Sequence, residues 1–243
     1  MTDVPPSSSH GTRCAGDVRQ PSAGVLSLII VHHLNNSRSQ RILWMLEELQ
    51  LPYDIRFYRR DPQTMFAPPE LKRVHPLGKS PILEDTDGPD GDPIILVETG
   101  AICEYLVEKA GGRLGPPADP LGALRYRQFL HYAEGSVMPA LFAKLVASRV
   151  PLLGRLAAKR VQPMIDVHLD YVEQELARRQ WFAGDTMSAA DIMMSFPLEA
   201  ARARAGLAEG RPATVAWLDR IHGRPAYQAA LAKGGEYAFS KPS

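Results

Sequence analysis

The sequence predicts two domains, a small α/β domain over residues 25–112 and an all-helical domain over residues 121–243. Two observations lead to this fold class. Up to residue 112, short β-rich apolar runs alternate with helical periods, whereas only helical periods follow. The Pro-rich stretch 113–120 (RLGPPADP) separates the two regions as a linker. At 243 residues, 45% of them hydrophobic, the chain is long enough to bury a full core without disulfides.

In the first domain the elements are expected in the order β-α-β-α-β-β-α. The first strand is the apolar run 26–32 (LSLIIVH), and the helix after it starts at Ser37 and ends before Pro52. The remaining elements are a strand at 53–58, a short helix ending at Val74, a strand beginning at Ile82, a strand at 94–97 and a helix at 99–109. A helix joins the first two strands, which should therefore be parallel. The short loop 85–93 should make the last two antiparallel.

The second domain is expected to contain five helices. Their predicted ranges are 121–148, 155–178, 188–205, 212–222 and 225–233. Pro139 lies inside the first of them and should kink it. Ser188 and Asp191 have the spacing of a capping box, in which each side chain accepts from the other residue's backbone. This box is expected to be structural, with no catalytic role.

The overall composition excludes several classes of protein. Lys and Arg number 28 and Asp and Glu number 27, so a net charge of +1 gives no electrostatic reason for a nucleic acid or membrane partner. No apolar run approaches the roughly 18 residues of a membrane span. Residues 1–24 are rich in Pro, Ser and Gly, and we expect them to be disordered. They lack the apolar core of a secretory signal, so a cytoplasmic protein is expected.

Several catalytic motifs are missing from the sequence. There is no G-x-G-x-x-G, H-E-x-x-H or G-x-S-x-G, and the seven histidines show no metal spacing. No metal is therefore expected. The two cysteines do not form a C-x-x-C pair, so dithiol redox chemistry would need a thiol from another molecule.

Two segments carry residues suited to an anionic, peptide-like ligand. The first, 35–41, joins the first strand to the first helix, where Asn36 or Ser37 can cap the helix or donate to a bound anion. The second is Lys79-Ser80-Pro81. A proline that opens a strand is no normal ladder donor, and a cis Ser80–Pro81 bond would leave the Ser80 backbone free to pair with an extended peptide. Each feature alone also fits an ordinary helix cap or edge strand.

A third segment lies between the last strand and its helix. Thr99 is suited to cap that helix, whose free N–H groups favour a carboxylate. Glu98 precedes it and could accept a hydrogen bond from an ammonium group. The pair suits the α-carboxylate and α-amino group of an amino acid, although a simple capped helix is an equally good interpretation.

The order of elements, together with HHLNNSRSQRILWMLEEL, HPLGKSPILED, VETGAICEYL and FAGDTMSAADI, resembles the glutathione S-transferase family. The first of these motifs most resembles bacterial and fungal serine-type members, and the resemblance extends from residue 25 to about residue 230. It implies a thioredoxin-like first domain that binds glutathione and a helical second domain that lines the pocket for an electrophile. It also implies a cytoplasmic homodimer that acts in detoxification.

The resemblance also implies roles for individual residues. The catalytic hydroxyl corresponds to Ser37, and the contacts to glutathione correspond to Ser80 (cysteinyl unit), Lys79 (glycyl end), and Glu98 and Thr99 (γ-glutamyl unit). No tyrosine or cysteine occupies the first loop, which excludes the tyrosine-type and cysteine-type subclasses. His75 stands where many members have asparagine. Asn36 could contact the thiol instead of Ser37.

The implied reaction follows from thiol chemistry. A free thiol has a pKa of roughly 8.5, so little thiolate exists near neutral pH. A serine hydroxyl can donate a hydrogen bond to the sulfur anion and so lower that pKa by about one to two units. The expected function is therefore conjugation of glutathione, as co-substrate, to small hydrophobic electrophiles. A glutathione-dependent reductase or peroxidase, favoured if Asn36 faces the sulfur, and a non-enzymatic binding protein are the alternatives.

Two further sets of residues are candidates for the second substrate. Phe129, Tyr132 and Phe142 could line an electrophile pocket, or could simply be core aromatics. Residues 135–165 contain five cations and no acidic residue: Lys144, Arg149, Arg155, Lys159 and Arg160. They could attract an anionic substrate, or could form an ordinary solvated face.

Overall fold

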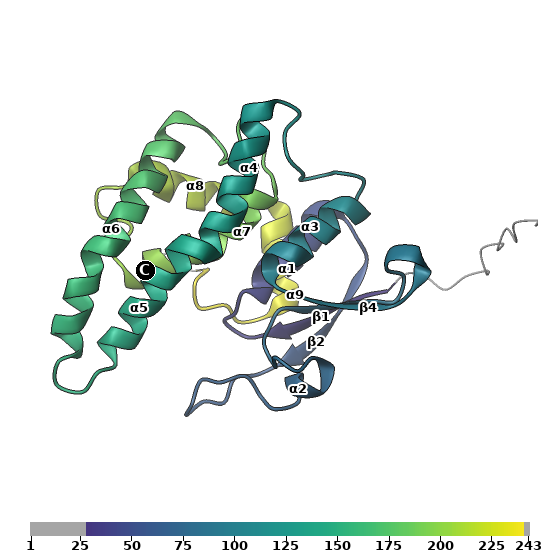
Figure 1. The fold of residues 1–243 in the computed structure, drawn as a ribbon, viewed down its shortest axis with the longest axis horizontal. Helices are drawn as coiled ribbons and strands as arrows, with labels where there is room; N and C mark the ends of the chain where they lie inside the picture. The colour runs from purple at the N-terminus through teal and green to yellow at the C-terminus, as the bar shows by residue number, and fades with distance from the viewer. Residues whose placement is uncertain (1–27, 241–243) are drawn as a thin grey trace, which may run out of the picture.

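A computed structural model describes residues 28–240 of the chain. The segment 1–24, predicted to be disordered, lies outside these residues. In the described part, a four-stranded sheet with helices against it forms the N-terminal region, and a mostly helical region follows (Figure 1). The fold class predicted from the sequence is confirmed.

The sheet has the strand order β2-β1-β3-β4. Its strands are β1 (Ile29–Leu34), β2 (Tyr53–Tyr58), β3 (Ile82–Asp85) and β4 (Ile94–Val97). β1 pairs with β2 in parallel, while β3 runs antiparallel to both β1 and β4. The predicted parallel and antiparallel pairs are therefore both present. A short 3₁₀ turn, η1 (Pro89–Gly91), lies in the β3–β4 loop.

The first strand is shifted relative to its prediction. The strand continues to Leu34, whereas the sequence predicts that the strand ends at His32 and that Leu34 lies in a turn. Parallel pairing with β2 explains the extension, because His33 and Leu34 face Phe57 and Tyr58 in the register. His33 and Leu34 are both buried, and β1 continues as far as its partner strand does.

Helices α1 (Ser39–Leu49) and α3 (Thr99–Lys109) pack with the sheet, and the one-turn helix α2 (Leu71–Val74) lies in the connection between β2 and β3. The predicted start of the first helix at Ser37 is wrong, and so is the cap role predicted for Thr99, although the range 99–109 is confirmed. Helix α1 begins at Ser39, because the Ser37 hydroxyl accepts a hydrogen bond from the Ser39 N–H in a tight turn before the helix. Thr99 is the first helical residue of α3 and not its cap, because the carbonyl of Glu98 already accepts from the Ile102 N–H.

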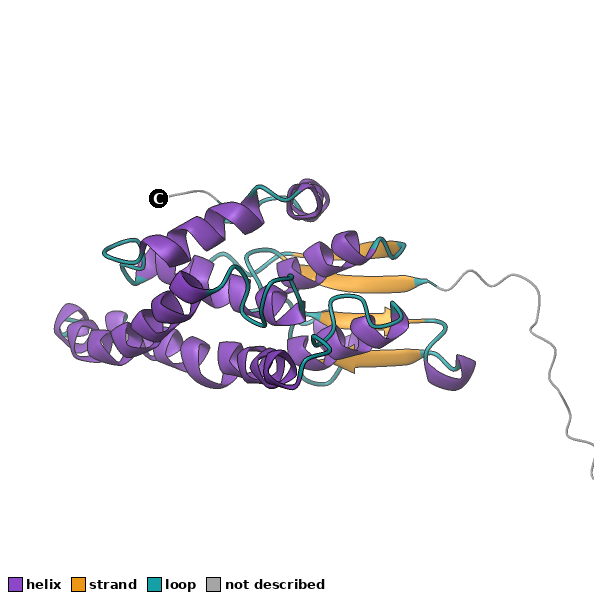
Figure 2. Ribbon diagram, turned by 90° about the horizontal axis from the view of Figure 1, so that it is seen from above, coloured by secondary structure: helices purple, strands orange, loops and turns teal. Residues whose placement is uncertain are grey.

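The second domain contains helices α4 (Pro120–Tyr132), α5 (Met138–Ser148), α6 (Gly154–Arg178), α7 (Ala189–Arg204), α8 (Pro212–His222) and α9 (Pro225–Gly234). The segment predicted as one helix over 121–148 is interrupted by a π-helical turn, η2 (Ala133–Val137). Pro139 lies in the first turn of α5, just after this π-helical turn, so the interruption precedes the proline that was expected to kink the helix. Helices α5 and α6 form a hairpin that points away from the sheet (Figures 1 and 2).

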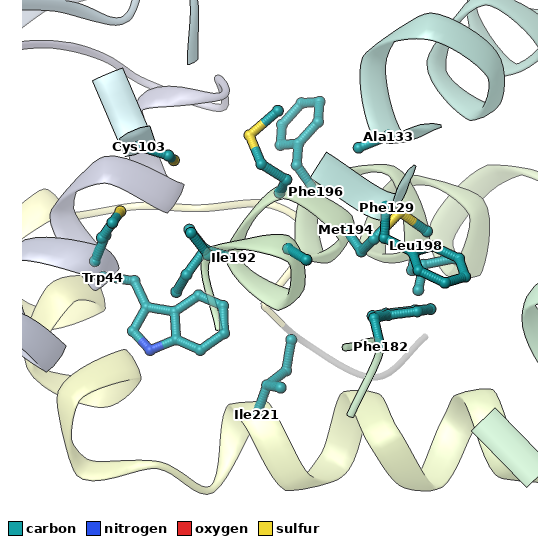
Figure 3. Packing of buried hydrophobic residues seen from close by; sticks show 14 of the residues in the cluster. Trp44, Cys103, Phe129, Ala133, Phe182, Ile192, Met194, Phe196, Leu198 and Ile221 are labelled. Atoms are coloured by element: carbon teal, nitrogen blue, oxygen red, sulfur yellow. The ribbon is translucent and has the colours of Figure 1, made fainter. Parts of the chain in front are cut away.

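Helix α7 lies at the centre of the core. All of its residues from Ala189 to Ala201 are buried, and it contacts α1, α3, α4, α5 and α8. In Figure 3 its Ile192 lies beside Trp44 of α1, while its Leu198 lies near Phe129 and Phe182. One hydrophobic cluster therefore includes residues of both domains.

The capping box predicted at the start of α7 is present and larger than expected. The Ser188 N–H donates to Asp191 at 2.9 Å, and the Ser188 side chain accepts from the N–H of Asp191. The Asp191 carboxylate also accepts from the N–H of Phe182 at 3.1 Å and from the indole of Trp217 at 3.3 Å. Burial raises the pKa of Asp191 to about 6, although these donors act to lower it.

This network predicts that Asp191→Ala destabilises the protein. The substitution leaves several fully buried donors unpaired, each at a cost of about 1–3 kcal/mol, so we expect a loss of about 2–4 kcal/mol in the free energy of unfolding. Denaturant unfolding measures this loss, and activity per folded molecule should stay nearly normal. Unchanged stability with abolished turnover would instead assign Asp191 to the active site.

Candidate functional site

Three of the segments selected from the sequence lie at one end of the sheet. In the register, His32 of β1 faces Ile82 of β3, and Ile82 faces Val97 of β4. The C-terminal ends of β1 and β4 therefore meet the N-terminal end of β3. The residues that follow or precede these ends are 35–38, 79–81 and 98–99. Chain topology alone places the three candidate segments beside one another.

Ser37 lies in the turn between β1 and α1 and is nearly buried, with 3% of its surface exposed. Its hydroxyl accepts from the Ser39 N–H at 3.2 Å and lies 2.7 Å from the Ser39 hydroxyl. The Ser39 hydroxyl in turn lies 2.9 Å from Nδ1 of His33. Ser37 is thus the outer member of a row of three polar side chains, two of which the sequence interpretation did not include.

Asn36, the alternative thiol partner, has a left-handed backbone with φ of 51°. Its side-chain oxygen accepts a hydrogen bond from the Ala238 N–H at 2.7 Å, so the last described segment of the chain contacts the first loop. Arg60 donates to the backbone carbonyl of Asn35, and its backbone N–H donates to the Asn35 side chain. Asn36 retains its amide N–H groups as donors, and both Asn36 and Ser37 stay candidates for the thiol contact.

The Ser80–Pro81 peptide bond is cis, which is the arrangement that the peptide-pairing interpretation of this segment requires. The Ser80 hydroxyl donates to the carbonyl of His32 at 2.8 Å, which ties this loop to β1. Pro81 is buried at the start of β3, whereas Lys79 is exposed. Gly78 has a φ of +55°, a conformation that favours glycine and positions the loop. Lys79 therefore extends from a fixed loop into solvent beside the site.

Glu98 connects β4 to α3 with a strained backbone, at φ 72° and ψ 117°. Strained backbone in a non-glycine residue is concentrated at ligand-binding sites. The Glu98 side chain is exposed, and within residues 28–240 no ion pair or hydrogen bond engages its carboxylate. Thr99 behind it is buried. An exposed carboxylate next to the free N–H groups of a helix start can receive both charged groups of an amino acid.

A partly buried ion-pair network lies behind the first loop, and sequence reasoning missed it. Glu134 of η2 accepts from Nε of Arg38 at 2.9 Å and from Arg41 at 2.5 Å. Arg41 is 1% exposed and also donates to the carbonyl of Met193 at 2.6 Å. Both guanidinium groups lie over the Phe196 ring at about 5.5 Å. Burial acts to raise the pKa of Glu134, but the Arg41 charge and the two arginine hydrogen bonds hold it below its usual value.

Of the three proposed pocket aromatics, Phe129 and Tyr132 lie edge to face with ring centroids 6.0 Å apart, whereas Phe142 lies on another helix. Phe129 is fully buried and stacks on Tyr171 and Phe182, so it is a core residue. Tyr132 is half-buried, and its hydroxyl bonds to His168 at 2.6 Å. Phe142 is 61% exposed on α5. Within the described residues these three do not form the wall of a common pocket.

A cavity of about 320 Å³ lies on the other side of β1 from the cis-proline loop. It is lined by His33, Asn35, Phe57, Tyr58, Arg59 and the segment 234–236.

Among residues 28–240, no cluster of three or more His, Cys, Asp or Glu side chains could hold a metal ion. None of the helices in that same part of the chain is long and apolar enough to cross a membrane.

Two family models match the chain. The model for the glutathione S-transferase N-terminal domain matches residues 37–109, and the model for the C-terminal domain matches residues 139–225. Together they cover most of the two domains described above.

Curated relatives extend this similarity across the chain. Glutathione S-transferase 3 of Schizosaccharomyces pombe is 35% identical, over 85% of this chain and 88% of the relative. The disulfide-bond oxidoreductase YfcG of Escherichia coli is 30% identical, over 85% of this chain and 95% of its own length.

Solved structures give the same result. A glutathione S-transferase from Actinobacillus pleuropneumoniae superposes with a TM-score of 0.76 at 31% identity, covering 88% of this chain and 96% of that one. A glutathione transferase from Burkholderia graminis, solved with two glutathione molecules bound per subunit, has a TM-score of 0.72 at 26% identity. It covers 87% of this chain and 90% of its own.

Proposed function

The chain belongs to the glutathione S-transferase family, and from that premise we propose that it conjugates glutathione to small hydrophobic electrophiles. The proposal gives Ser37 the thiol contact, Ser80 the cysteinyl backbone, Lys79 the glycyl carboxylate, and Glu98 and Thr99 the γ-glutamyl group. The observation that carries it is the meeting of these three segments at one end of the sheet.

Each contact has a chemical reason. The γ-glutamyl group carries an ammonium and a carboxylate, which match the Glu98 carboxylate and the start of α3. The glycyl end carries a carboxylate, which matches the exposed Lys79 ammonium. Ser37 would donate a charge-assisted hydrogen bond to the sulfur, which favours the thiolate form at neutral pH. The bound thiolate would then attack an electrophile held nearby, so that proximity supplies much of the rate.

A second candidate function is glutathione-dependent disulfide reduction. The similarity to a disulfide-bond oxidoreductase supports it, as does the position of Asn36. The Asn36 oxygen is occupied by the Ala238 N–H, so its amide N–H groups are the part left for a ligand. Cys103, the cysteine among the described residues, is fully buried in α3 and burial raises its pKa to about 12, so this proposal takes the reductive thiol from glutathione. Detoxification and a cytoplasmic location stay predictions of the family resemblance.

We further propose that the protein is a homodimer formed through the α5–α6 hairpin. Lys144 of α5 donates to Gln162 of α6 on one face of the hairpin. At about 100° per residue, positions two apart lie on nearly opposite sides of a helix. The opposite face therefore includes Phe142 and Val146 of α5 and Leu156, Met164 and Val167 of α6. Each of these apolar residues is more than half exposed.

A second copy of this chain is the occupant that fits this face. Several large apolar side chains exposed on one face of a hairpin are typical of an interaction site. A face made of two helices can pair with its own copy about a two-fold axis. Homodimer interfaces are richer in apolar surface than the rest of a protein exterior, which matches these five side chains.

The activity is tested with glutathione and three co-substrates side by side: an aryl halide, an organic hydroperoxide and a mixed disulfide. We expect turnover with the aryl halide and, for Ser37→Ala, a loss of about 10-fold or more in kcat with little change in glutathione affinity. The pH–rate profile of Ser37→Ala should move to higher pH, because the thiolate loses a hydrogen-bond donor. Turnover of the disulfide alone, and dependence on Asn36 instead of Ser37, would favour the reductase.

Glu98→Ala is expected to weaken glutathione binding by about 1.5–3 kcal/mol, the value of a hydrogen bond to a charged group. Isothermal titration calorimetry measures the change, and Glu104→Ala, an exposed carboxylate further along α3, is the matched control. Equal glutathione affinity of the Glu98→Ala variant and the control would remove Glu98 from the binding site.

The dimer is tested by placing a charge in the proposed interface. Val146→Glu and Val167→Glu should each convert the dimer to a monomer in light scattering coupled to size exclusion. Leu152→Glu, at the fully exposed tip between the helices, is the control and should leave the dimer intact. A wild-type protein that is monomeric, or variants that remain dimeric, would refute the interface.

A further inference from the structure

The row of side chains behind Ser37 has a defined direction. Nδ1 of the buried His33 ring lies 2.9 Å from the Ser39 hydroxyl, and the backbone of Gly234 acts to raise the pKa of His33, which is the effect of a carbonyl that accepts from the ring. A backbone carbonyl only accepts, so the ring proton is on Nε2 and Nδ1 is an acceptor. The Ser39 hydroxyl proton therefore points to Nδ1. The Leu34 carbonyl, at 3.4 Å, is a poorer acceptor for the same proton.

The remaining hydrogen bonds then follow from the number of acceptor sites on each hydroxyl. The Ser39 oxygen accepts from the Leu34 N–H at 3.2 Å, and its second acceptor site faces the Ser37 hydroxyl at 2.7 Å. The Ser37 proton therefore points to Ser39. The Ser37 oxygen accepts from the Ser39 N–H and has one acceptor site left. In the unliganded protein both hydroxyl protons thus point inward, toward His33.

We propose that Ser37, Ser39 and His33 form a proton relay that carries the thiol proton of bound glutathione away from the site. The inference rests on the proposed function, in which the glutathione sulfur contacts Ser37. Ser37 would touch the substrate, whereas Ser39 and His33 act through it as positioning residues.

The proton transfer balances without any further reactant. The S–H bond of glutathione breaks and its proton bonds to the Ser37 oxygen, the Ser37 proton moves to the Ser39 oxygen, and the Ser39 proton moves to Nδ1 of His33. No electrons are exchanged. The shift also reverses every hydrogen bond in the row, so Ser37 now donates to the thiolate and accepts from Ser39. The same three residues first accept the proton and then stabilise the anion.

His33 is placed to release the proton and not to keep it. The ring lines the cavity of about 320 Å³ beside β1, on the side away from the cis-proline loop. Burial lowers the pKa of His33 to about 4, against a small opposing effect of the Gly234 hydrogen bond. The charged groups that line this cavity are Arg59 at the end of β2 and Glu236 after α9, with Tyr58 beside them. The proton that arrives on Nδ1 makes the ring an imidazolium, which then releases its Nε2 proton to solvent in this cavity and stays protonated on Nδ1.

The packing around His33 holds the ring in place. A methyl group on Gly234 would meet the Gln40 side chain at 2.7 Å and the Leu43 side chain at 2.8 Å, and it would lie 3.5 Å from the His33 ring. Phe57 contacts the ring edge-on, with a centroid distance of 5.9 Å. His32, the neighbouring histidine of the same strand, instead bonds through Nδ1 to Tyr58. It provides a matched control on the same strand.

The test uses the purified full-length protein and glutathione alone. The pKa of the bound thiol is measured from the ultraviolet absorbance of the thiolate, for the wild type and for Ser37→Ala, Ser39→Ala, His33→Gln and His32→Gln. Glutamine at position 33 can accept a hydrogen bond but takes up no proton. Glutathione affinity and melting temperature show which variants are folded, and Ser39→Thr restores the hydroxyl if Ser39→Ala fails to fold.

We expect Ser39→Ala to raise the pKa of the bound thiol by about 1, as for loss of one hydrogen bond within the row. The same substitution made in the Ser37→Ala background should have no further effect, because Ser39 acts through Ser37. In weak buffer with an indicator dye, proton release on mixing with glutathione should be slower for His33→Gln than for His32→Gln.

The outcomes separate this inference from the proposed function. If Ser37→Ala leaves the pKa of the bound thiol unchanged while glutathione still binds, the assignment of Ser37 fails and the relay fails with it. If Ser37→Ala raises that pKa but Ser39→Ala and His33→Gln behave like His32→Gln, the proposed function stands and the relay is overturned. An equal effect of Ser39→Ala with and without Ser37 also overturns the relay.

Discussion

The buried guanidinium of Arg41 holds the two domains in one arrangement. It extends from α1 of the first domain to Glu134 of η2 and to the Met193 carbonyl of α7, both in the second domain. A buried charge that loses its partner costs about 3–5 kcal/mol, so neither domain can move away without a large penalty. The π-helical turn is what brings Glu134 into reach. The irregular backbone of η2 thus serves the contact on which the geometry of the first loop depends.

That contact lies directly behind the residues proposed to bind glutathione. Arg38 shares Glu134 with Arg41 and follows Ser37 in the chain, so the turn that positions Ser37 is fixed from the second domain. Phe196 of α7 supports both guanidinium groups from one side. The two domains therefore build the thiol end of the site jointly, while Ser80 and Glu98 belong to the first domain alone.

The sequence predicted those features that follow from local periodicity and short motifs. The limits of β2, β4 and α8 and the box at Ser188 and Asp191 could be predicted because each depends on a few neighbouring residues. The predicted end of the first strand was wrong because pairing with β2 sets that end. Each β1 residue pairs with a β2 residue 24 positions further along the chain. The Ser39–His33 hydrogen bond and the Arg41–Glu134 pair were missed because side chains that meet only after folding leave no pattern in the sequence.

The hydrogen bond from the Ala238 N–H to Asn36 joins positions 202 residues apart. During synthesis the first domain leaves the ribosome long before Ala238 does, because the ribosome adds only about 5–20 residues per second. For that interval Asn36 lacks this partner, and His33 lacks the backbone of Gly234. The loop that would bind the thiol therefore acquires part of its native contacts only when the end of the chain has been made. The site is therefore complete only after the second domain and the segment that follows α9 have been synthesised.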